Sequence, residues 1–427
     1  MNKYEEVLKR ILPEINPTKQ ETASINSFLK DFNSSLKKEL ANKKLDAQVF
    51  VGGSFAKGTM IKKGRYDIDV FIRFSEEYRG KNISDLTEKM LKRFVKKGLS
   101  RVHGSRDYFR VEADSSFFLE VIPVIKVKNP KQAENITDLS YFHVAYTKKK
   151  LKTEKIVQDI RIAKAFCHAN NCYGAESYIN GFSGYALELL IYHYKGFVNF
   201  LKASQKIKEQ EIIDIEKLYK NKNEVLMNMN SAKMTSPIVL IDPTYKERNA
   251  LAALSKETFE MFNKAGARFL NDFSVEYFKE RKEDVEKIKR EAEKKNFNFV
   301  EISLSTDKQD GDIAGTKLLK FFNYLTLQLS KLYDIKKKGF DYNGKQEASC
   351  FFVVNPKKEI EFTGPSVDDK KNCEAFKKRH KKTFVKNKKL YATESFNKKL
   401  KVYLKEWKSI NSQKIIEMHI NNFEIKD

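Results

Sequence analysis

The chain has 427 residues, with 82 Lys and Arg against 57 Asp and Glu, and a formal net charge of +25. At about 150 residues per domain, this length predicts two to four domains and excludes one small module. Hydrophobic residues make up 41 % and aromatic residues 12 % of the chain, which excludes a wholly disordered protein.

The first part of the sequence predicts a mixture of helices and strands. Thr18 and Glu21 form a capping box, and apolar residues at helical spacing follow it as far as position 40. Three runs rich in Val, Ile and Phe have the length of strands, at 48–51, 66–74 and 117–127. The first 145 or so residues therefore predict an α+β domain.

The middle third of the sequence predicts mainly helices. One helical stripe begins at Thr153 and ends near Asn170, and a second helix is expected from 184 to about 203, after a glycine-containing turn. Residues 204–235 are rich in lysine and poor in apolar side chains, which indicates an exposed connection or a peripheral helix. A helical period returns over 255–278.

The last third predicts a further α+β part. Residues 299–304 have the pattern of a strand and residues 316–332 that of a helix. Two short apolar runs, 349–354 and 359–362, flank an Asn-Pro-Lys-Lys turn and predict a hairpin.

The remaining composition indicates a soluble cytosolic protein with a polyanionic partner. The sequence begins without the apolar segment of a signal peptide, and no stretch approaches the roughly 18 uncharged apolar residues that a spanning helix needs. Excess positive charge favours polyanions, because Lys and Arg release counterions from phosphates, but it does not separate RNA from DNA or an anionic membrane. The spacing of the cysteine and histidine residues excludes a disulfide framework and a zinc site. Buried reduced thiols are therefore expected at Cys167, Cys172, Cys350 and Cys373.

The strongest chemical signal is an acid pair that follows a glycine-serine turn. Asp67 and Asp69 point to the same face of the strand predicted at 66–74, and two like charges there favour a compensating cation such as Mg²⁺ shared with substrate phosphates. A solvated Asp pair on an edge strand is the alternative. Gly53 lets the backbone approach a phosphate closely and Ser54 adds a hydroxyl, so the combination favours a nucleotide site.

Gly53-Ser54, twelve residues and then Asp67-Ile-Asp69 resemble the signature of nucleotidyltransferases with the DNA polymerase β palm fold. The segments 172–190 and 241–252 are similar to segments of archaeal, class I, CCA-adding tRNA nucleotidyltransferases. With Ser140-Tyr-Phe-His143 and Gly364-Pro365, the resemblance spans almost the whole chain. It implies an α+β protein with a polymerase β-like head at 1–145, a helical neck at 146–258 and a tRNA-binding body and tail at 259–427.

The resemblance also implies a two-metal-ion reaction. A third carboxylate would complete the metal site, and Glu120 occupies its position, where aspartate is more usual. Asp67, Asp69 and Glu120 would then hold two Mg²⁺ about 3.5–4 Å apart. An RNA 3′-hydroxyl would attack the α-phosphate of CTP or ATP and release pyrophosphate.

The family pattern assigns the nucleotide contacts residue by residue. Arg248 would lie beside the incoming base, where its planar guanidinium supplies a donor fork that lysine lacks. We interpret Tyr185 and Glu188, which lie one helical turn apart, as supporting their helix rather than contacting substrate. The residues implied at the triphosphate or its turn are Gly53, Ser54, Lys57 (where relatives often carry Arg), His143, Lys164 and Tyr173.

A basic segment at 370–390 predicts a tRNA contact. It holds ten Lys or Arg against one acid, with aromatic residues between them, so it can follow phosphates and stack on exposed bases. A solvated lysine-rich surface is the alternative. The resemblance implies binding of the acceptor stem and TΨC arm, and the residues chosen for it are Lys370, Lys371, Lys377, Lys378 and Arg379.

The leading hypothesis is therefore a template-independent enzyme that adds C, C and A to the tRNA 3′ end. A poly(A) polymerase or oligoadenylate synthase is one alternative, and a catalytically idle RNA-binding protein is another, because Glu120 replaces the usual aspartate. The sequence leaves the oligomeric state open, with a homodimer as one option.

Overall fold

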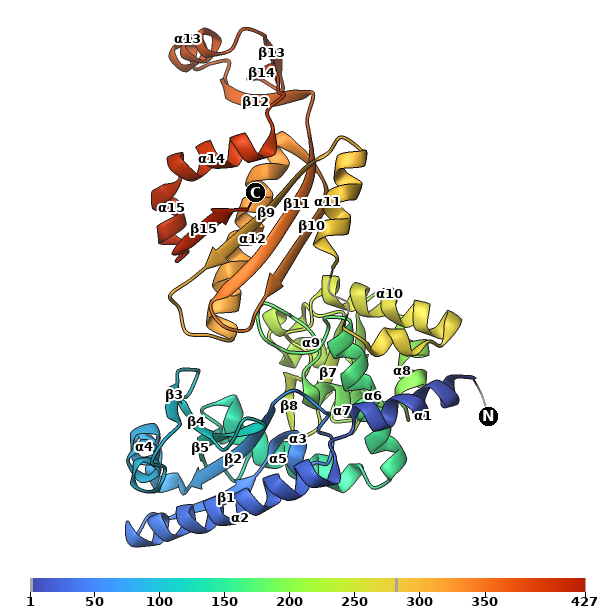
Figure 1. Cartoon of the computed structure of the whole chain (residues 1–427), viewed down its shortest axis with the longest axis vertical. Helices are drawn as coiled ribbons and strands as arrows, with labels where there is room; N and C mark the ends of the chain where they lie inside the picture. Colours follow the sequence, from blue (N-terminus) through green and yellow to red (C-terminus); the bar gives the residue numbers. More distant parts are fainter. Residues whose placement is uncertain (1–2, 281–282, 427) are drawn as a thin grey trace. The chain divides into compact units, whose positions relative to one another are not determined.

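The computed structural model describes residues 3–280 and 283–426. The chain divides into two compact units, Met1–Arg281 and Lys282–Asp427. Each unit combines helices with sheets, which confirms the predicted α+β class (Figure 1). Within the described ranges, no helix is both long enough and apolar enough to cross a membrane.

The first unit begins with a five-stranded sheet in the order β1-β2-β5-β4-β3. Strands β2 and β5 are parallel, and their register places Asp69 opposite Glu120. At the start of both strands buried residues alternate with partly exposed ones, so one face enters the core and the other carries the acids. The strands are β1 (Ala47–Val51), β2 (Tyr66–Phe74), β3 (Leu99–Val102), β4 (Tyr108–Glu112) and β5 (Phe117–Ile125).

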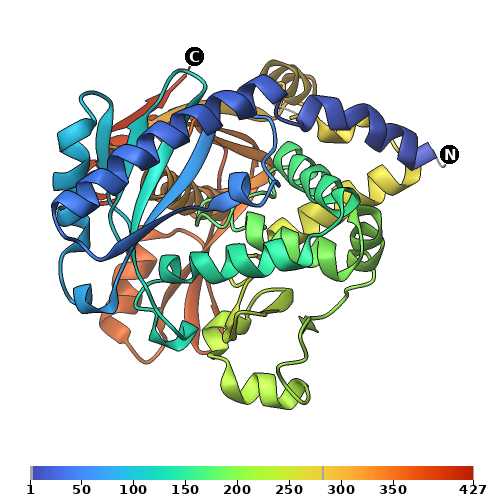
Figure 2. The same ribbon diagram turned by 90° about the horizontal axis from the view of Figure 1, so that it is seen from below.

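Two helices pack on the apolar face of this sheet. The long helix α2 (Lys19–Asn42) runs beside the strands (Figure 2), and its apolar stripe shares a core with α4 (Ile83–Phe94) and the sheet. The predicted capping box is confirmed: the Thr18 hydroxyl accepts from the Glu21 N–H at 3.1 Å, and the Glu21 carboxylate accepts from the Thr18 N–H at 2.7 Å. The two helices therefore cover the face of the sheet opposite Asp67, Asp69 and Glu120.

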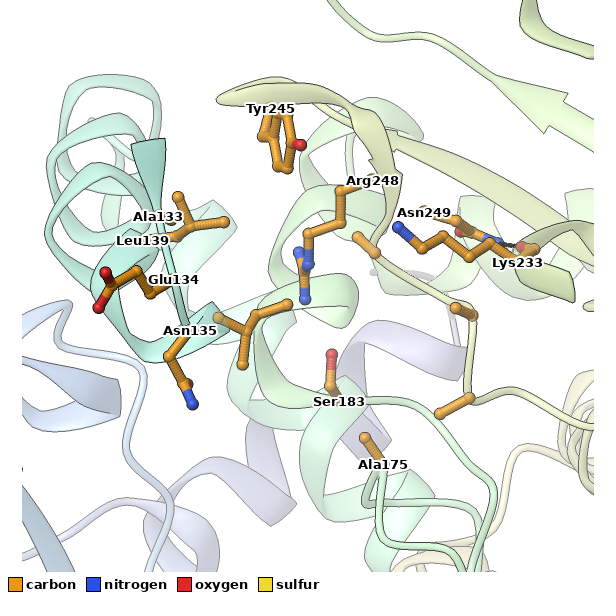
Figure 3. A pocket seen from close by; sticks show the side chains of 14 residues that line it. Ala133, Glu134, Asn135, Leu139, Ala175, Ser183, Lys233, Tyr245, Arg248 and Asn249 are labelled. Atoms are coloured by element: carbon orange, nitrogen blue, oxygen red, sulfur yellow. Dashed lines mark hydrogen bonds between the residues drawn. The ribbon is translucent and has the colours of Figure 1, made fainter. Parts of the chain in front are cut away.

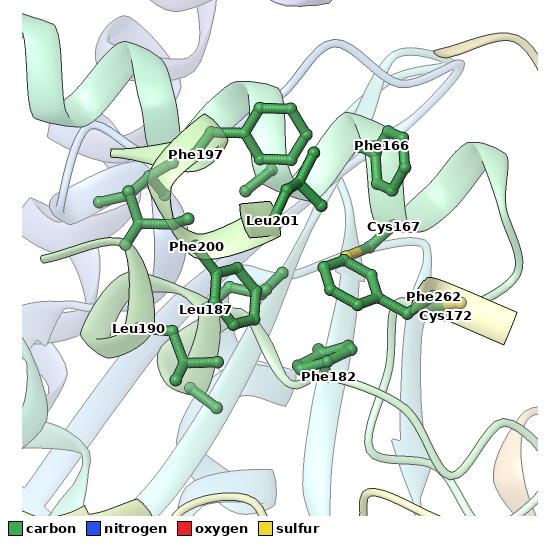
Figure 4. Packing of buried hydrophobic residues seen from close by; sticks show 14 of the residues in the cluster. Phe166, Cys167, Cys172, Phe182, Leu187, Leu190, Phe197, Phe200, Leu201 and Phe262 are labelled. Carbon is green, nitrogen blue, oxygen red and sulfur yellow. The ribbon is translucent and has the colours of Figure 1, made fainter. Parts of the chain in front are cut away.

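A second core of the same unit is helical (Figure 4). It buries Cys167 and Cys172 among phenylalanine and leucine side chains, and all four cysteines of the chain are buried and free, as predicted. Helix α1 (Lys3–Ile15) also packs into this core. The other helices here are α5 (Ser140–Lys150), α6 (Glu154–Ala169), α7 (Gly184–His193), α8 (Phe197–Ser204) and α10 (Lys256–Asp272).

The prediction of a single helix over 184–203 is wrong. The structure has two helices there, α7 and α8, because the backbone between them leaves the helical region, with φ of 57° at Lys195 and 135° at Gly196. The apolar pattern continues through the break because both helices face the same core.

The lysine-rich segment 204–235 contains more structure than an exposed connection. It includes the short helix α9 (Lys222–Asn228) and the strand β6 (Glu211–Ile213). β6 pairs in parallel with β7 (Ile238–Asp242), which pairs with β8 (Tyr245–Asn249). This small sheet carries two side chains of the site described below.

Helix α10 accounts for most of the helical period predicted at 255–278. It ends where Phe273 adopts a left-handed φ of 46°, and a 3₁₀ turn at Val275–Phe278 follows. Aromatic side chains of α10 pack into the helical core, so residues 259–280 belong to the first unit. The second compact unit begins at Lys282.

The second unit contains a four-stranded antiparallel sheet in the order β10-β11-β9-β15. Helices α12 (Asp312–Leu332) and α14 (Leu400–Ile410) share its main core, and α11 (Val285–Lys294) packs against β9 and β11 in a smaller cluster. Helix α15 (Ser412–Glu417) precedes the last strand. The strands are β9 (Asn298–Ser305), β10 (Tyr333–Tyr342), β11 (Glu347–Pro356) and β15 (Asn422–Ile425).

The hairpin predicted between 349–354 and 359–362 is wrong. Strand β11 pairs with β9 and β10, so both of its edges are occupied. The next strand, β12 (Glu359–Ser366), instead pairs with β14 (Lys389–Ser395) in a separate three-stranded sheet, whose third strand is β13 (Thr383–Lys386). Helix α13 (Lys370–Arg379) packs beside β12.

Candidate active site

The glycine turn lies directly against one of the acids. Strand β1 ends at Val51, and the one-turn helix α3 (Gly53–Ala56) follows. The Gly52 N–H donates to the Asp69 carbonyl at 2.9 Å. Gly53 has a φ of +59°, and a Cβ built on it would overlap the Asp69 carboxylate. Only glycine fits this close approach, and Ser54 lies in the same turn.

Three carboxylates share one face of the sheet. Asp67 and Asp69 alternate with buried residues along β2, and Glu120 lies in register with Asp69 on β5. Burial, the Glu120 charge and the Asp67 charge raise the pKa of Asp69 to about 7. Burial and the Asp67 charge also raise the pKa of Glu120. The structure therefore places the three predicted acids on one face of the sheet, Glu120 included.

The donor set fits a hard divalent cation. Carboxylate oxygens are the ligands that such cations prefer. The raised pKa values reflect burial first and neighbouring negative charge second, and a cation would relieve the charge. Two basic side chains contact the acids: Lys63 Nζ lies 2.9 Å from Asp67 Oδ1, and Arg110 Nη2 lies 3.4 Å from Glu120 Oε1. Over 3–280 and 283–426, no three His, Cys, Asp or Glu side chains are gathered closely enough to hold an ion.

Lys57 and Lys164 meet at a buried glutamate. Glu188 Oε2 lies 2.6 Å from Lys57 Nζ, and Glu188 Oε1 lies 3.0 Å from Lys164 Nζ. Thr59 donates its hydroxyl to Glu188 Oε1 at 2.6 Å. Glu188 was expected to support its own helix, but its carboxylate instead contacts the loop that follows the glycine-serine turn. Sequence reasoning missed this role.

A second buried carboxylate, Asp242 at the end of β7, contacts His143 and Arg248. Asp242 Oδ2 lies 3.0 Å from His143 Nε2 and 2.7 Å from Arg248 Nη1. Tyr185 donates its hydroxyl to Asp242 Oδ1 at 3.1 Å, and its ring stacks on His143. Burial by itself would raise the pKa of Asp242, but hydrogen bonding and the charges of His143 and Arg248 hold it well below its usual range. Burial lowers the pKa of His143, although Asp242 opposes that shift.

Arg248 also lines a pocket of about 340 Å³ (Figure 3). Its side chain reaches into the pocket between Tyr245 and Ser183, and the segment around Leu139 forms another wall. Several of the other lining residues are alanines, so much of the wall is apolar. Such a pocket with one fixed guanidinium can hold a flat heterocycle and bind its edge.

Tyr173 lies near Lys164. Its ring stacks on His168 with centroids 4.0 Å apart. A Cβ on Gly184 would lie 2.8 Å from the Tyr173 hydroxyl and 3.6 Å from Lys164 Nζ. The hydroxyl and the ammonium group therefore face the same glycine at the start of α7.

The predicted tRNA-binding residues lie on the second unit. They belong to helix α13, whose one buried residue is Cys373. Their charges are available to a polyanion, because the side chains of this set lie at the surface of the helix: Lys370, Lys371, Lys377, Lys378 and Arg379.

The two buried carboxylates, Glu188 and Asp242, are the site residues that sequence reasoning missed. A signal existed for Glu188, because it is an acid inside an otherwise apolar helix, and a buried acid needs cationic partners. Asp242 ends an apolar strand in the same way. Neither signal identifies the partners, which lie far away along the sequence.

The contact between Gly53 and Asp69 makes one substitution informative. Gly53→Ala is expected to lower activity by about 10²-fold or more, because the new methyl group must displace a carboxylate whose position matters. Steady-state rates of nucleotide addition measure this. Gly80→Ala is the matched control: Gly80 has a similar φ of +74°, but nothing lies within 4 Å of a Cβ built on it. Equal activity losses in both variants would contradict the interpretation.

Comparison with known proteins gives consistent results for both parts of the first unit. Residues 1–157 match the family model of the Second Messenger Oligonucleotide or Dinucleotide Synthetase domain, and residues 158–279 match that of the tRNA nucleotidyltransferase second domain. The chain is 35 % identical to the CCA-adding enzyme of Nanoarchaeum equitans, over 79 % of this chain and 81 % of the relative. It is 26 % identical to that of Methanocaldococcus jannaschii, over 91 % and 87 % respectively.

Solved structures support the fold alone. A Cid1 poly(U) polymerase mutant bound to MgATP matches with a TM-score of 0.52 and 13 % identity, over 66 % of this chain and 99 % of that chain. A cytoplasmic RNA terminal U-transferase matches with a TM-score of 0.50 and 12 % identity, over 66 % and 100 %.

Proposed function

This chain belongs to the family of archaeal CCA-adding enzymes, and we propose that it adds C, C and A to the 3′ end of tRNA at the three-acid face of its first sheet. One observation supports placing the reaction at this face. Parallel pairing of β2 with β5 places Glu120 opposite Asp69, and Gly53 brings the glycine-serine turn against the Asp69 carboxylate. A nucleotide and a cation can therefore bind side by side.

The reaction is a metal-dependent nucleotidyl transfer from a nucleoside triphosphate. The RNA 3′-hydroxyl loses its proton to solvent as its oxygen forms a bond to the α-phosphorus. The bond from that phosphorus to the bridging oxygen of the β-phosphate breaks, which releases pyrophosphate. Asp67, Asp69 and Glu120 would hold the divalent cations, which we propose are two Mg²⁺. When bound, such ions lower the pKa of the attacking hydroxyl and stabilise the leaving group.

We assign the triphosphate to the residues around the glycine-serine turn. Ser54 contributes a hydroxyl, and Lys57 and Lys164 contribute positive charge. Tyr173 supplies a further hydroxyl. We also assign His143 to this site, where its Nε2 lies 3.0 Å from Asp242. The proposal is supported by the proximity of these groups to one another: Lys57 and Lys164 share Glu188, and Lys164 and Tyr173 both face Gly184.

We assign the base of the incoming nucleotide to the pocket that Arg248 lines. Asp242 fixes the guanidinium through Nη1 at 2.7 Å, which leaves its other N–H groups for a ligand. A guanidinium held in this way can distinguish the edges of bases, because hydrogen bonds with wrong partners cannot form without moving a partly buried ion pair.

We assign part of the tRNA contact to α13 and propose that it binds the acceptor stem and TΨC arm. Double-helical RNA is recognised mainly through its shape, phosphates and 2′-hydroxyls, which suits exposed lysines. The head, neck and body-tail division, the homodimer and the cytoplasmic location also stay predictions.

Replacing Lys370, Lys371 and Arg379 together by alanine is expected to weaken tRNA binding and to flatten its dependence on salt. The slope of log affinity against log salt should fall in magnitude by about 0.7–0.9 for each phosphate that the variant no longer neutralises. Filter binding of tRNA over a range of salt concentrations measures this slope. A triple replacement of Lys336, Lys337 and Lys338 on β10 is the charge-matched control. An unchanged slope in the α13 variant would remove this helix from the interface.

The choice of nucleotides tests the proposed function. A tRNA that lacks its last three nucleotides is incubated with CTP alone or with ATP alone. We expect CTP incorporation to stop after two residues and ATP alone to be a poor substrate. Long A-tails would instead indicate a poly(A) polymerase, and RNA binding without incorporation would indicate an idle RNA-binding protein.

A further inference from the structure

The loop at 57–59 connects the phosphate turn to the helical part of the first unit. Glu188 on α7 contacts both ends of this loop, through Lys57 Nζ at 2.6 Å and the Thr59 hydroxyl at 2.6 Å. The same carboxylate lies 3.0 Å from Lys164 Nζ on α6. The side chains of Glu188, Lys57 and Lys164 are only 1 %, 8 % and 2 % exposed.

Backbone contacts extend this connection to the turn itself. Lys164 Nζ donates to the Thr59 carbonyl at 3.1 Å, and the Arg161 guanidinium donates to the Gly58 carbonyl at 2.6 Å. The Thr59 N–H donates to the Ser54 carbonyl at 2.9 Å. A shift of Glu188 would therefore be passed on to both ammonium groups and to the turn that carries Ser54.

Two buried ammonium groups, those of Lys57 and Lys164, share the Glu188 carboxylate. Lys57 also acts on the charge of Asp69, so this cluster is electrostatically connected to the acids of the sheet. Two ammonium groups held close together attract a polyphosphate, and this suits a substrate site as well as a structural salt bridge.

We propose that Glu188 is a positioning residue of the triphosphate site, which holds the ammonium groups of Lys57 and Lys164 and the turn at Ser54 in the arrangement that binds phosphates. The proposal rests on the proposed function for those three residues. It adds that the affinity for a polyphosphate depends on a carboxylate that does not touch it.

The protonation of Lys164 gives the role a measurable signature. Burial lowers the pKa of Lys164 to about 8, with Lys57 and Lys63 contributing, while Glu188 opposes the shift. The facing groups are thus Glu188 on α7 and two lysines from the loops, with His168 and Tyr173 nearby. Removing the Glu188 charge should lower this pKa further, and removing the Lys57 charge should raise it. The two substitutions therefore shift the pKa in opposite directions.

Binding of inorganic tripolyphosphate to the full chain tests the proposal without tRNA or a nucleoside. Affinity is measured by thermal shift from pH 6 to pH 9.5 for the wild type, Glu188→Gln and Lys57→Met. We expect Glu188→Gln to lose affinity at least tenfold at pH 8, to recover most of it near pH 6, and to show its alkaline fall at lower pH than the wild type. Lys57→Met should show that fall at higher pH.

Protonation of tripolyphosphate itself is common to all variants, so only differences between variants count. Glu216→Gln is the control, because Glu216 also pairs with a lysine, Lys150 at 2.7 Å, but lies outside the site. Unshifted profiles, or an equal loss of affinity at every pH, would overturn the proposal. If Glu188→Gln does not fold, the Lys57→Met variant is sufficient as a test. A pH profile of tripolyphosphate affinity in Lys57→Met that is not shifted from the wild type would then overturn the proposal. Tripolyphosphate binding with the expected shifts but no addition to tRNA would count against the proposed function instead.

Discussion

Asp69→Asn is expected to slow nucleotide addition by about 10³-fold or more, with tRNA affinity within about twofold of the wild type. Asparagine keeps the shape that packs against Gly53, so the turn should stay in place. It removes the negative charge that lies opposite Glu120 and beside Asp67. Single-turnover addition of the first nucleotide measures the rate, and filter binding measures the affinity.

The same substitution should raise the unfolding temperature when divalent cations are chelated. Burial and the neighbouring acids raise the pKa of Asp69 from 3.8 to about 7 in the folded chain. Its ionised form is therefore disfavoured by folding, and the resulting loss of stability grows as pH rises from about 4 and is complete above about 7. At pH 8 the neutral asparagine avoids this loss of stability. Unchanged activity of Asp69→Asn, or loss of its tRNA binding together with its activity, would contradict the role of Asp69 in nucleotide addition.

Arg248→Ala is expected to reduce kcat/KM for CTP and for ATP by about 10²-fold, because hydrogen bonds from a charged donor contribute about 1.5–3 kcal/mol and Asp242 is left partly unpaired. Discrimination against UTP and GTP should fall as well. Arg248→Lys should not restore selectivity, because lysine lacks the planar donor fork. Steady-state kinetics with each of the four triphosphates measures both effects.

The neighbouring Lys246 provides the control for this prediction. It lies on the same strand, two positions away, and its ammonium group lies over the Tyr219 ring. Lys246→Ala is expected to keep the preference for CTP and ATP. If Arg248→Ala retains full selectivity, or if Lys246→Ala loses it to the same extent, the pocket in Figure 3 does not select the base.

The sequence predicted those parts of the fold that depend on local patterns. Alternation along β2 predicted a strand with Asp67 and Asp69 on one face, and the structure has that strand at Tyr66–Phe74. The capping box at Thr18 predicted the start of α2. In each case the deciding contacts lie within a few residues, so the sequence contains the information directly.

Errors arose where distant segments decide the structure. The strand β12 was expected to pair with β11, but both edges of β11 are filled by strands from elsewhere in the chain. Helix 184–203 was expected to be continuous, because an apolar stripe on two helices that face one core looks the same as a stripe on one helix. Backbone conformation at Lys195 and Gly196 makes the difference.

The candidate site shows the same limit. Asp67, Asp69 and Glu120 were found from strand patterns and family resemblance. The partners of Glu188 and Asp242 were not, since Glu188 and Lys57 are 131 positions apart and His143 and Asp242 are 99 positions apart. Only the folded chain brings these charges together, and burial then determines how strongly they interact.

Sequencing the products made on a tRNA that lacks its last three nucleotides, with all four triphosphates present, is the most direct test. We expect the wild type to add C, C and A in that order and then stop, and Asp69→Asn to leave the same tRNA unextended. Tails of another sequence or of indefinite length, or normal extension by Asp69→Asn, would contradict the assignment of CCA addition to the three-acid face.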